Sequence, residues 1–214
     1  ELGAPSEKVF NVGNIKFDDV MMENKGSIPI LKSQKHVLVA GSTHPGEEAI
    51  VLNTFIKHKN SWNLIIAPRH IERVAEIIKL VETYGLKTGR FSEIKDQGFL
   101  KNEVVVVDTI GQLRRIYQEA TLVFVGKSLC VGGGHNIIEP ALYAKPILVG
   151  PMMQNFRDIT ALFKAQDAIV QVDNHVEFEA QMDRLMNDDV LRNHFGQKAL
   201  SVVTENQGAL QRTL

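Results

Sequence analysis

The chain has 214 residues, of which 44% are hydrophobic and 23% charged, and its formal net charge is −1. These values are ordinary for a folded globular domain, and such a balanced charge argues against a nucleic-acid partner. The single cysteine, Cys130, excludes an intramolecular disulfide and fits a reducing compartment. No apolar run approaches the roughly 20 residues that span a bilayer, so we expect a soluble chain.

Short apolar strands alternate with amphipathic helices along the chain. Strands are predicted at 36–40, 63–67, 104–107, 122–125, 146–149 and 169–172. Helices are predicted at 47–58, 71–84 and 157–165. One more helix ends near residue 119, another begins at 137, and further helices follow from 176 onward. The stretch at 91–102 is the least regular. This alternation predicts an α/β fold with a mainly parallel sheet covered by helices on both faces. Ligands of such sheets bind at the carboxyl ends of strands, so the loops that follow strands are the candidate sites.

A glycine-rich loop follows the predicted strand at 122–125. Gly133 and Gly134 would let the backbone approach a ligand, and the helix expected from 137 would offer its positive end to a phosphate. His135 and Asn136 add donors beside that phosphate, and the Glu139 carboxylate matches the two hydroxyls of a ribose. The alternative is a flexible turn, with Glu139 as a charge at the start of a helix.

Arg69 directly follows the strand predicted at 63–67. A guanidinium at the carboxyl end of a strand can grip a phosphate or a carboxylate with two hydrogen bonds. The alternative is a solvated arginine that pairs with Glu72 or Glu76.

The loop at 41–48 is rich in hydrogen-bond donors and precedes a predicted helix. Its N–H groups could meet an anion, or the loop could be an ordinary helix start capped by Ser42 or Thr43. Glu47 and Glu48 lie in the first turn, where the helix dipole favours negative charge.

The loop at 150–156 follows the next strand along the chain. Asn155 could reach a ligand, and Met152 or Met153 could pack on a base, although methionines more often pack in the core. Cys130, beside the glycine loop, is expected to be a small buried residue rather than a nucleophile.

Several common motifs are absent from the sequence. No G-x-G-x-x-G opens the first strand–helix unit, and no G-x-x-x-x-G-K-[ST] occurs. The sequence has no D-x-D, and its histidines lack the spacing of zinc ligands. We therefore expect neither a metal nor a dinucleotide cofactor.

The chain resembles the carboxyl-terminal half of bacterial 3-deoxy-D-manno-octulosonic acid (Kdo) transferases. Six segments in the family's order show this resemblance: GNIKFD at 13–18, AGSTHPGEE at 40–48, APRHIER at 67–73, VVDTIGQLRRIY at 106–117, FVGKSLCVGGGHNIIEPA at 124–141 and GPMMQNFRDI at 150–159. Lys127 is a departure, since it stands where the family often has glycine, and Cys130-Val131-Gly132 is an unusual lead-in to the glycine pair.

The resemblance implies the carboxyl-terminal half of a GT-B glycosyltransferase, with residues 1–17 as a linker and 18–214 as the domain that binds CMP-Kdo. It implies an inverting, metal-independent transfer of Kdo to lipid A precursor in lipopolysaccharide biosynthesis. The acceptor site, the membrane contact and the catalytic base would lie in an amino-terminal domain, at the cytoplasmic face of the inner membrane. The chain alone is then expected to be inactive.

The resemblance also assigns roles to residues. It implies that Arg69 meets the donor phosphate or the Kdo carboxylate, and that Glu139 holds the ribose. The phosphate loop would comprise Gly133, Gly134, His135 and Asn136. The base would lie near Ile110 and Gly111, and the transferred sugar near Ser42 and His44.

Two other functions fit the same residues. One is a different GT-B protein, such as a UDP-sugar transferase or a UDP-sugar 2-epimerase. The other is a nucleotide-binding module without catalysis. The preferred nucleotide separates the first alternative from a Kdo transferase.

Overall fold

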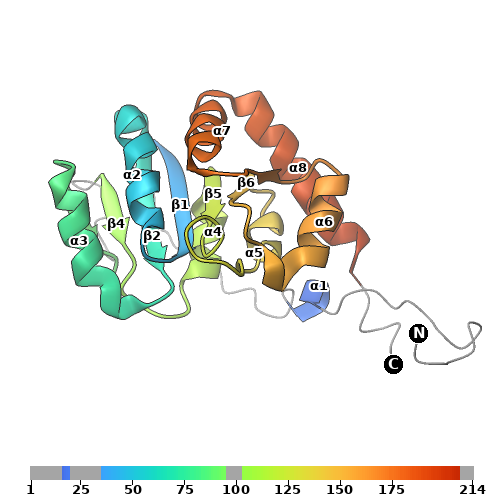
Figure 1. The fold of residues 1–214 in the computed structure, drawn as a ribbon, viewed down its shortest axis with the longest axis horizontal. Coiled ribbons are helices and arrows are strands. Elements are labelled where there is room, and N and C mark those ends of the chain that lie inside the picture. The colour runs from blue at the N-terminus through green and yellow to red at the C-terminus, as the bar shows by residue number, and fades with distance from the viewer. Residues whose placement is uncertain (1–15, 20–34, 95–102, 208–214) are drawn as a thin grey trace, which may run out of the picture.

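The fold is an α/β domain built on seven parallel strands (Figure 1), described by a computed structural model for residues 16–19, 35–94 and 103–207. The sheet order is β3-β4-β2-β1-β5-β6-β7. The strands are β1 His36–Thr43, β2 Trp62–Pro68, β3 Thr88–Arg90, β4 Val104–Val106, β5 Leu122–Val125, β6 Ile147–Val149 and β7 Val170–Gln171. The predicted class, a parallel sheet with helices on both faces, is confirmed.

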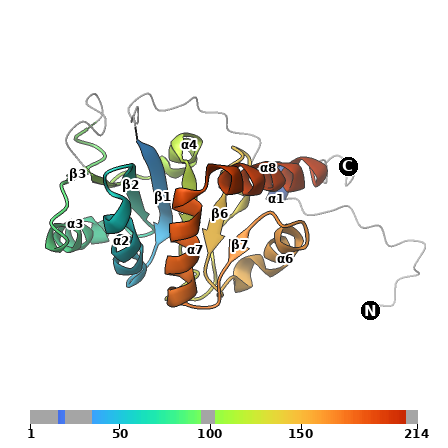
Figure 2. The ribbon, with the colours of Figure 1, turned by 90° about the horizontal axis from the view of Figure 1, so that it is seen from above.

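Helices lie between most of the successive strands and cover both faces of the sheet (Figure 2). They are α1 Lys16–Asp19, α2 Glu47–His58, α3 Val74–Thr83, α4 Leu113–Glu119, α5 Ile138–Ala141, α6 Arg157–Ala165, α7 His175–Asn187 and α8 Asp189–Glu205, with 3₁₀ turns at Ile71–Arg73 and Gln154–Phe156. None of the helices in the described ranges is long and apolar enough to cross a membrane.

The alternation of side chains along the strands divides the core into two layers. Leu38 and Ala40 of β1 pack with α2, α3 and α7, whereas Val37 and Val39 pack on the opposite face with α4, α5, α6 and α8. All seven residues of β2 are buried, as expected for a central parallel strand.

The structure differs from the sequence-based expectations at three places. β3 was not predicted, because Thr88-Gly89-Arg90 has no apolar side chain. The helix expected from 137 is only the short α5. Residues 1–15 of the expected linker and 95–102 of the irregular stretch lie outside the described residues, while Phe17 is buried in the core.

The strand order reverses direction at β1. The chain first proceeds from β1 to β2 on one side, and then returns to place β5 on the other side. Open α/β sheets bind ligands in the crevice that forms at such a reversal, beyond the carboxyl ends of the strands. The fold therefore directs attention to the loops that follow β1 and β5.

Candidate nucleotide-binding site

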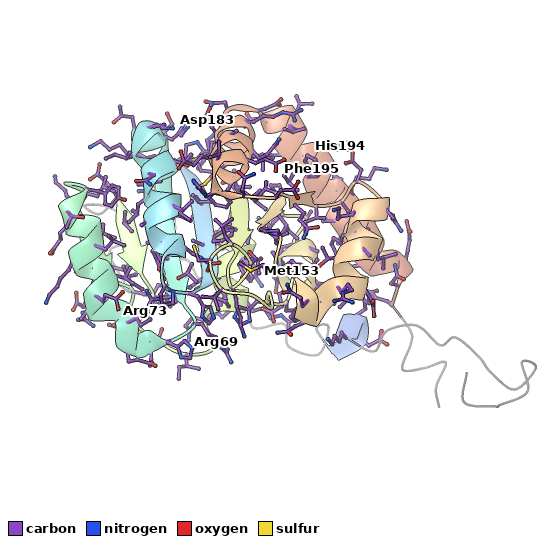
Figure 3. The ribbon with its side chains drawn as sticks, viewed as in Figure 1. Arg69, Arg73, Met153, Asp183, His194 and Phe195 are labelled. Atoms are coloured by element: carbon purple, nitrogen blue, oxygen red, sulfur yellow. The ribbon has the colours of Figure 1, made fainter. Side chains whose placement is uncertain are left out.

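The expected site residues lie on the loops that follow five adjacent strands, β4, β2, β1, β5 and β6. Because all strands are parallel, these loops lie at one edge of the sheet. Arg69 lies at this edge in Figure 3, and Met153 lies further inside the molecule. The sequence thus brings its candidates together, although their roles differ in detail from those expected.

Glu47 joins the loop after β1 to the loop after β5. Its side chain is fully buried, and its carboxylate accepts hydrogen bonds from the N–H of His44 at 2.9 Å and Lys127 at 2.9 Å. The N–H groups of Ser128 and Leu129 donate to its other oxygen, both at 3.0 Å. Burial raises the pKa of Glu47, and these four bonds oppose that rise. Glu47 is therefore an organiser of the crevice rather than a mere helix-dipole charge.

Glu48 has a different internal partner. Its buried carboxylate forms a two-pronged ion pair with the Arg73 guanidinium, at 2.7 and 3.2 Å. Neither Ser42 nor Thr43 caps α2, since the N-cap residue is Gly46 and no side chain caps this helix. The alternative of a side-chain-capped helix start is therefore wrong for this loop.

A cluster of histidines lies beyond the carboxyl ends of β1, β2 and β5, in the region where the strand order reverses. The Nε2 atoms of His44 and His135 are 3.4 Å apart, and the His70 ring meets the His44 ring edge-on at 5.5 Å. Burial, followed by the charges of His44, Arg69, Lys127 and His70, lowers the pKa of His135 to about 4. Burial likewise lowers the pKa of His44, with Lys127 adding to the effect. His135 is therefore neutral at pH 7 and can donate or accept a hydrogen bond.

Arg69 lies beside a small pocket at the ends of β2 and β4. The pocket has a volume of about 110 Å³, and its lining includes Ser42, Arg69, Thr109, Ile110 and Gly111. Ile110 is 81% exposed, and the buried Thr109 hydroxyl has no hydrogen-bond partner within the described part of the chain. The pocket is therefore lined both by Ile110 and Gly111, the residues expected near a base, and by Arg69, the residue expected to bind an anion.

The alternative partners of Arg69 are engaged elsewhere. Glu72 lies 3.4 Å from His70 Nδ1, and Glu76 pairs with Arg73 at 3.2 Å. Among the residues described, no carboxylate forms an ion pair with Arg69. Its exposed guanidinium is therefore available to an anion.

The two central glycines are required by packing within the protein. Gly133 N–H donates to Gln154 Oε1 at 2.9 Å, and Gly134 N–H donates to the Lys127 carbonyl at 2.7 Å. A Cβ on Gly133 would lie 2.7 Å from Asn155 Nδ2, and one on Gly134 would collide with Met153 Sδ. Both N–H groups therefore already have partners inside the protein.

The segment after the glycines orients Glu139. Asn136 Oδ1 accepts from the Ile138 N–H at 3.0 Å, and Asn136 Nδ2 donates to Glu139 Oε1 at 3.3 Å. Burial raises the pKa of Glu139, which the Asn136 bond and the Arg114 charge oppose. With α5 only four residues long, these side chains rather than a long helix dipole define the polarity here.

Asn155 and Met153 support the glycine loop from the β6 side. The Asn155 N–H donates to the Gly133 carbonyl at 2.8 Å, while its side chain is exposed. Met153 is buried in the core against Gly134, as methionines usually are. Cys130 is exposed, contrary to the expectation of a buried residue.

Sequence reasoning missed two kinds of residue. The buried roles of Glu47 and Glu48 depend on partners distant in sequence, and no local pattern reports them. Lys127 was noted only as a departure from the family, yet its charge bears on both crevice histidines. The residues that the structure describes contain no group of three His, Cys, Asp or Glu side chains able to hold a metal ion.

Comparison with known proteins shows what the chain is similar to. A Haemophilus influenzae 3-deoxy-D-manno-octulosonic acid transferase is 33% identical over 100% of this chain and 52% of its own length. A bifunctional glycosyltransferase/methyltransferase of Fusobacterium nucleatum is 35% identical over 87% of this chain and 30% of its own length. The chain thus spans about half or less of these relatives. No protein-family profile matches it.

The fold matches solved glycosyltransferase structures. The C-terminal CMP-Kdo binding domain of WaaA from Acinetobacter baumannii superposes with a TM-score of 0.73 and 28% identity, covering 79% of this chain and 89% of that domain. Anabaena HepE in complex with UDP and glucose superposes with a TM-score of 0.59 at 12% identity, covering 83% of this chain and 45% of HepE, which shows the fold alone. These similarities confirm the resemblance to Kdo transferases and the fold class, that of the carboxyl-terminal half of a GT-B glycosyltransferase.

Proposed function

We propose that this relative of the Kdo transferases is the domain that binds their sugar-nucleotide donor, CMP-Kdo, with residues 18–214 forming the domain and 1–17 a linker. The observation that supports this most is the similarity to the CMP-Kdo binding domain of WaaA, which the chain matches over 89% of that domain. The candidate site lies at the reversal of strand order, where ligands of this fold class bind.

The anionic part of the donor is assigned to the crevice between β1 and β5. Arg69 has no carboxylate partner among the described residues, and His135 is a neutral hydrogen-bonding group beside it. CMP-Kdo has one phosphate, and its sugar has a carboxylate, so it presents two anions to this edge. We assign His44 and Ser42 to the neighbourhood of the transferred sugar, and Asn155 to the rim of the site.

The nucleoside is assigned to the neighbouring region of Glu139 and of the pocket at Ile110 and Gly111. Glu139 has one long hydrogen bond, to Asn136, and therefore keeps acceptor capacity for the two ribose hydroxyls. The cytosine is assigned to the pocket at Ile110 and Gly111, whose backbone groups would read its ring edge. Gly133, Gly134 and Asn136 shape the loop that leads to Glu139.

The whole protein is proposed to transfer Kdo from CMP-Kdo to lipid A precursor with inversion. The chain spans 52% of the Haemophilus influenzae transferase, which leaves room in such a protein for a second domain. We assign the acceptor site, the catalytic base and contact with the cytoplasmic face of the inner membrane to that second domain. Residues 1–214 alone would then transfer no Kdo, and robust turnover by the purified chain would contradict this assignment.

Titration calorimetry of the chain with CMP, UMP and UDP tests the proposal. We expect CMP to bind more tightly than UMP, since cytosine and uracil exchange a donor for an acceptor at one ring edge. The second phosphate of UDP should add little to its affinity. EDTA should leave CMP binding unchanged, because we expect protein side chains such as Arg69, rather than a metal ion, to meet the phosphate charge. Tighter binding of UDP than of CMP would favour a UDP-sugar protein. Binding of no nucleotide would remove the proposal.

A further inference from the structure

We propose that the Lys127 ammonium binds an anionic group of the donor, at the crevice between β1 and β5. This inference rests on the proposed function, because it adds a specific anion contact to the donor site. It concerns a side chain that neither the residue pattern nor the family resemblance places in the site.

The backbone holds Lys127 in an unusual conformation. Its φ is +58°, in the left-handed region that costs a non-glycine residue about 1 kcal/mol. Its N–H donates to the Glu47 carboxylate at 2.9 Å, and its carbonyl accepts from the Gly134 N–H at 2.7 Å. Both sides of the residue are therefore fixed, and the direction in which its side chain leaves the backbone is fixed as well.

The Lys127 side chain runs over the glycine loop. Its Cε lies 3.3 Å from the place that a Cβ on Gly133 would occupy. Asn155 Nδ2 lies close to the same place, at 2.7 Å. The Lys127 charge acts on both His44 and His135. The Lys127 side chain thus lies beside the glycine loop, close enough to both histidines for its charge to lower their pKa.

The charged groups that act on His135 are all basic, although Glu72 lies 3.4 Å from His70 Nδ1. Besides Lys127, the groups that act on His135 are Arg69, His44 and His70. The two nearby carboxylates have other partners, since Glu47 accepts four backbone N–H groups and Glu48 pairs with Arg73. No ion pair of Lys127 occurs within the described ranges. An anion in the crevice would supply the missing countercharge, and the donor has two: its phosphate and the carboxylate of its sugar.

The test compares Lys127→Gln and Lys127→Gly with the unaltered chain. Lys127→Gln keeps a long polar side chain without the charge, and Lys127→Gly removes the side chain and suits the left-handed backbone. Lys79→Gln, on the exposed surface of α3, is the matched control for loss of one positive charge. Thermal unfolding should give Lys127→Gly a Tm at or above that of the unaltered chain, which separates binding effects from folding.

The ligands are cytidine, CMP and CMP-Kdo. Cytidine has no anionic group, CMP has a phosphate, and CMP-Kdo has a phosphate and a carboxylate. If Lys127 binds the phosphate, both Lys127 variants should bind CMP about tenfold more weakly and cytidine equally well. If it binds the sugar carboxylate, the loss should appear only with CMP-Kdo. Unchanged affinity of both variants for all three ligands would overturn the inference and leave the donor assignment standing. Failure of the unaltered chain to bind CMP would remove the donor assignment, and this inference with it.

Discussion

Two glutamates lie at the site, one on each side of the crevice, and they are used in opposite ways. Glu47 is fully buried, and each of its oxygens accepts two backbone N–H groups, so its capacity is used inside the protein. Glu139 is partly exposed, and among the residues that the structure describes it accepts only from Asn136, at 3.3 Å. Burial raises the pKa of both carboxyls.

The contrast separates a carboxylate that builds the site from one that can serve a ligand. Both residues stand at the start of a helix, and both would be read from sequence as helix-dipole charges. What distinguishes them is how many internal donors each has. A carboxylate offers about four acceptor positions, so Glu47 is saturated whereas Glu139 is not.

The largest effect is expected from Glu47→Gln. The amide group turns donors toward backbone N–H groups and leaves buried donors unpaired, each costing about 1–3 kcal/mol. We expect the free energy of unfolding to fall by about 3 kcal/mol, measured by urea denaturation. Glu72→Gln, on an exposed glutamate, is the control and should change it by less than about 0.5 kcal/mol. A Glu47→Gln protein as stable as the original would end the distinction between the two glutamates.

Glu139→Gln should show the reverse pattern, with stability near that of the original chain and weaker nucleotide binding. Its charge-assisted bonds to the ribose would contribute roughly 1.5–3 kcal/mol each, so CMP affinity should fall by about tenfold to a few hundredfold. Titration calorimetry with CMP measures this loss. Unchanged CMP affinity would remove Glu139 from the site.

Gly134→Ala tests whether packing fixes the loop that presents Glu139. Gly134 has a φ of +72°, and an added Cβ would collide with Met153 Sδ, so we expect a loss of about 2 kcal/mol in stability. Gly132→Ala is the matched control, because a Cβ there meets its nearest neighbours at 3.5 Å, an ordinary contact. Equal stability of the two variants would mean that the glycines are not required by packing.

The effect expected to be smallest at pH 7 is that of His135, and it grows as the pH falls. Between pH 6.5 and about 4 the unfolded chain protonates His135 and the folded chain does not, so this residue lowers stability as the pH falls through that window. His44, whose pKa is also lowered, acts in the same direction. His135→Gln should therefore lose less stability than the original chain between pH 7 and pH 4, measured by thermal unfolding. Parallel curves for the two proteins would contradict this.

The fold was predictable because its signals are local. The apolar runs of β1, β2 and β5 and the helices between them followed directly from the pattern of the sequence. β3 was missed because Thr88-Gly89-Arg90 gains its strand conformation from pairing with β4, not from its own residues. The short length of α5 was not predicted. The helix ends at Ala141, and Ala144 soon afterwards has a left-handed backbone conformation.

The place of the candidate residues was predictable, whereas their contacts within the protein were less so. Arg69, His135 and Glu139 follow the expected strands, and parallel strands bring their ends to one edge. Which N–H groups of the glycine loop remain available depends on Gln154 and on the Lys127 carbonyl, and these contacts exist only after folding. The bond between Glu47 and Ser128 spans 81 positions, and no local pattern predicts it.

Glu47 holds the loop after β5 entirely through main-chain N–H groups. Every residue except proline has such a group, so this contact places no demand on which side chains stand at positions 127 and 129. Position 128 is more restricted, because the Ser128 hydroxyl also bonds the Val125 carbonyl and the Gly150 N–H. Position 129 can thus exchange its side chain while the shape of the loop stays constant, whereas the left-handed backbone at Lys127 favours glycine. A single substitution at position 129 then changes the side chain beside the site without rebuilding the scaffold beneath.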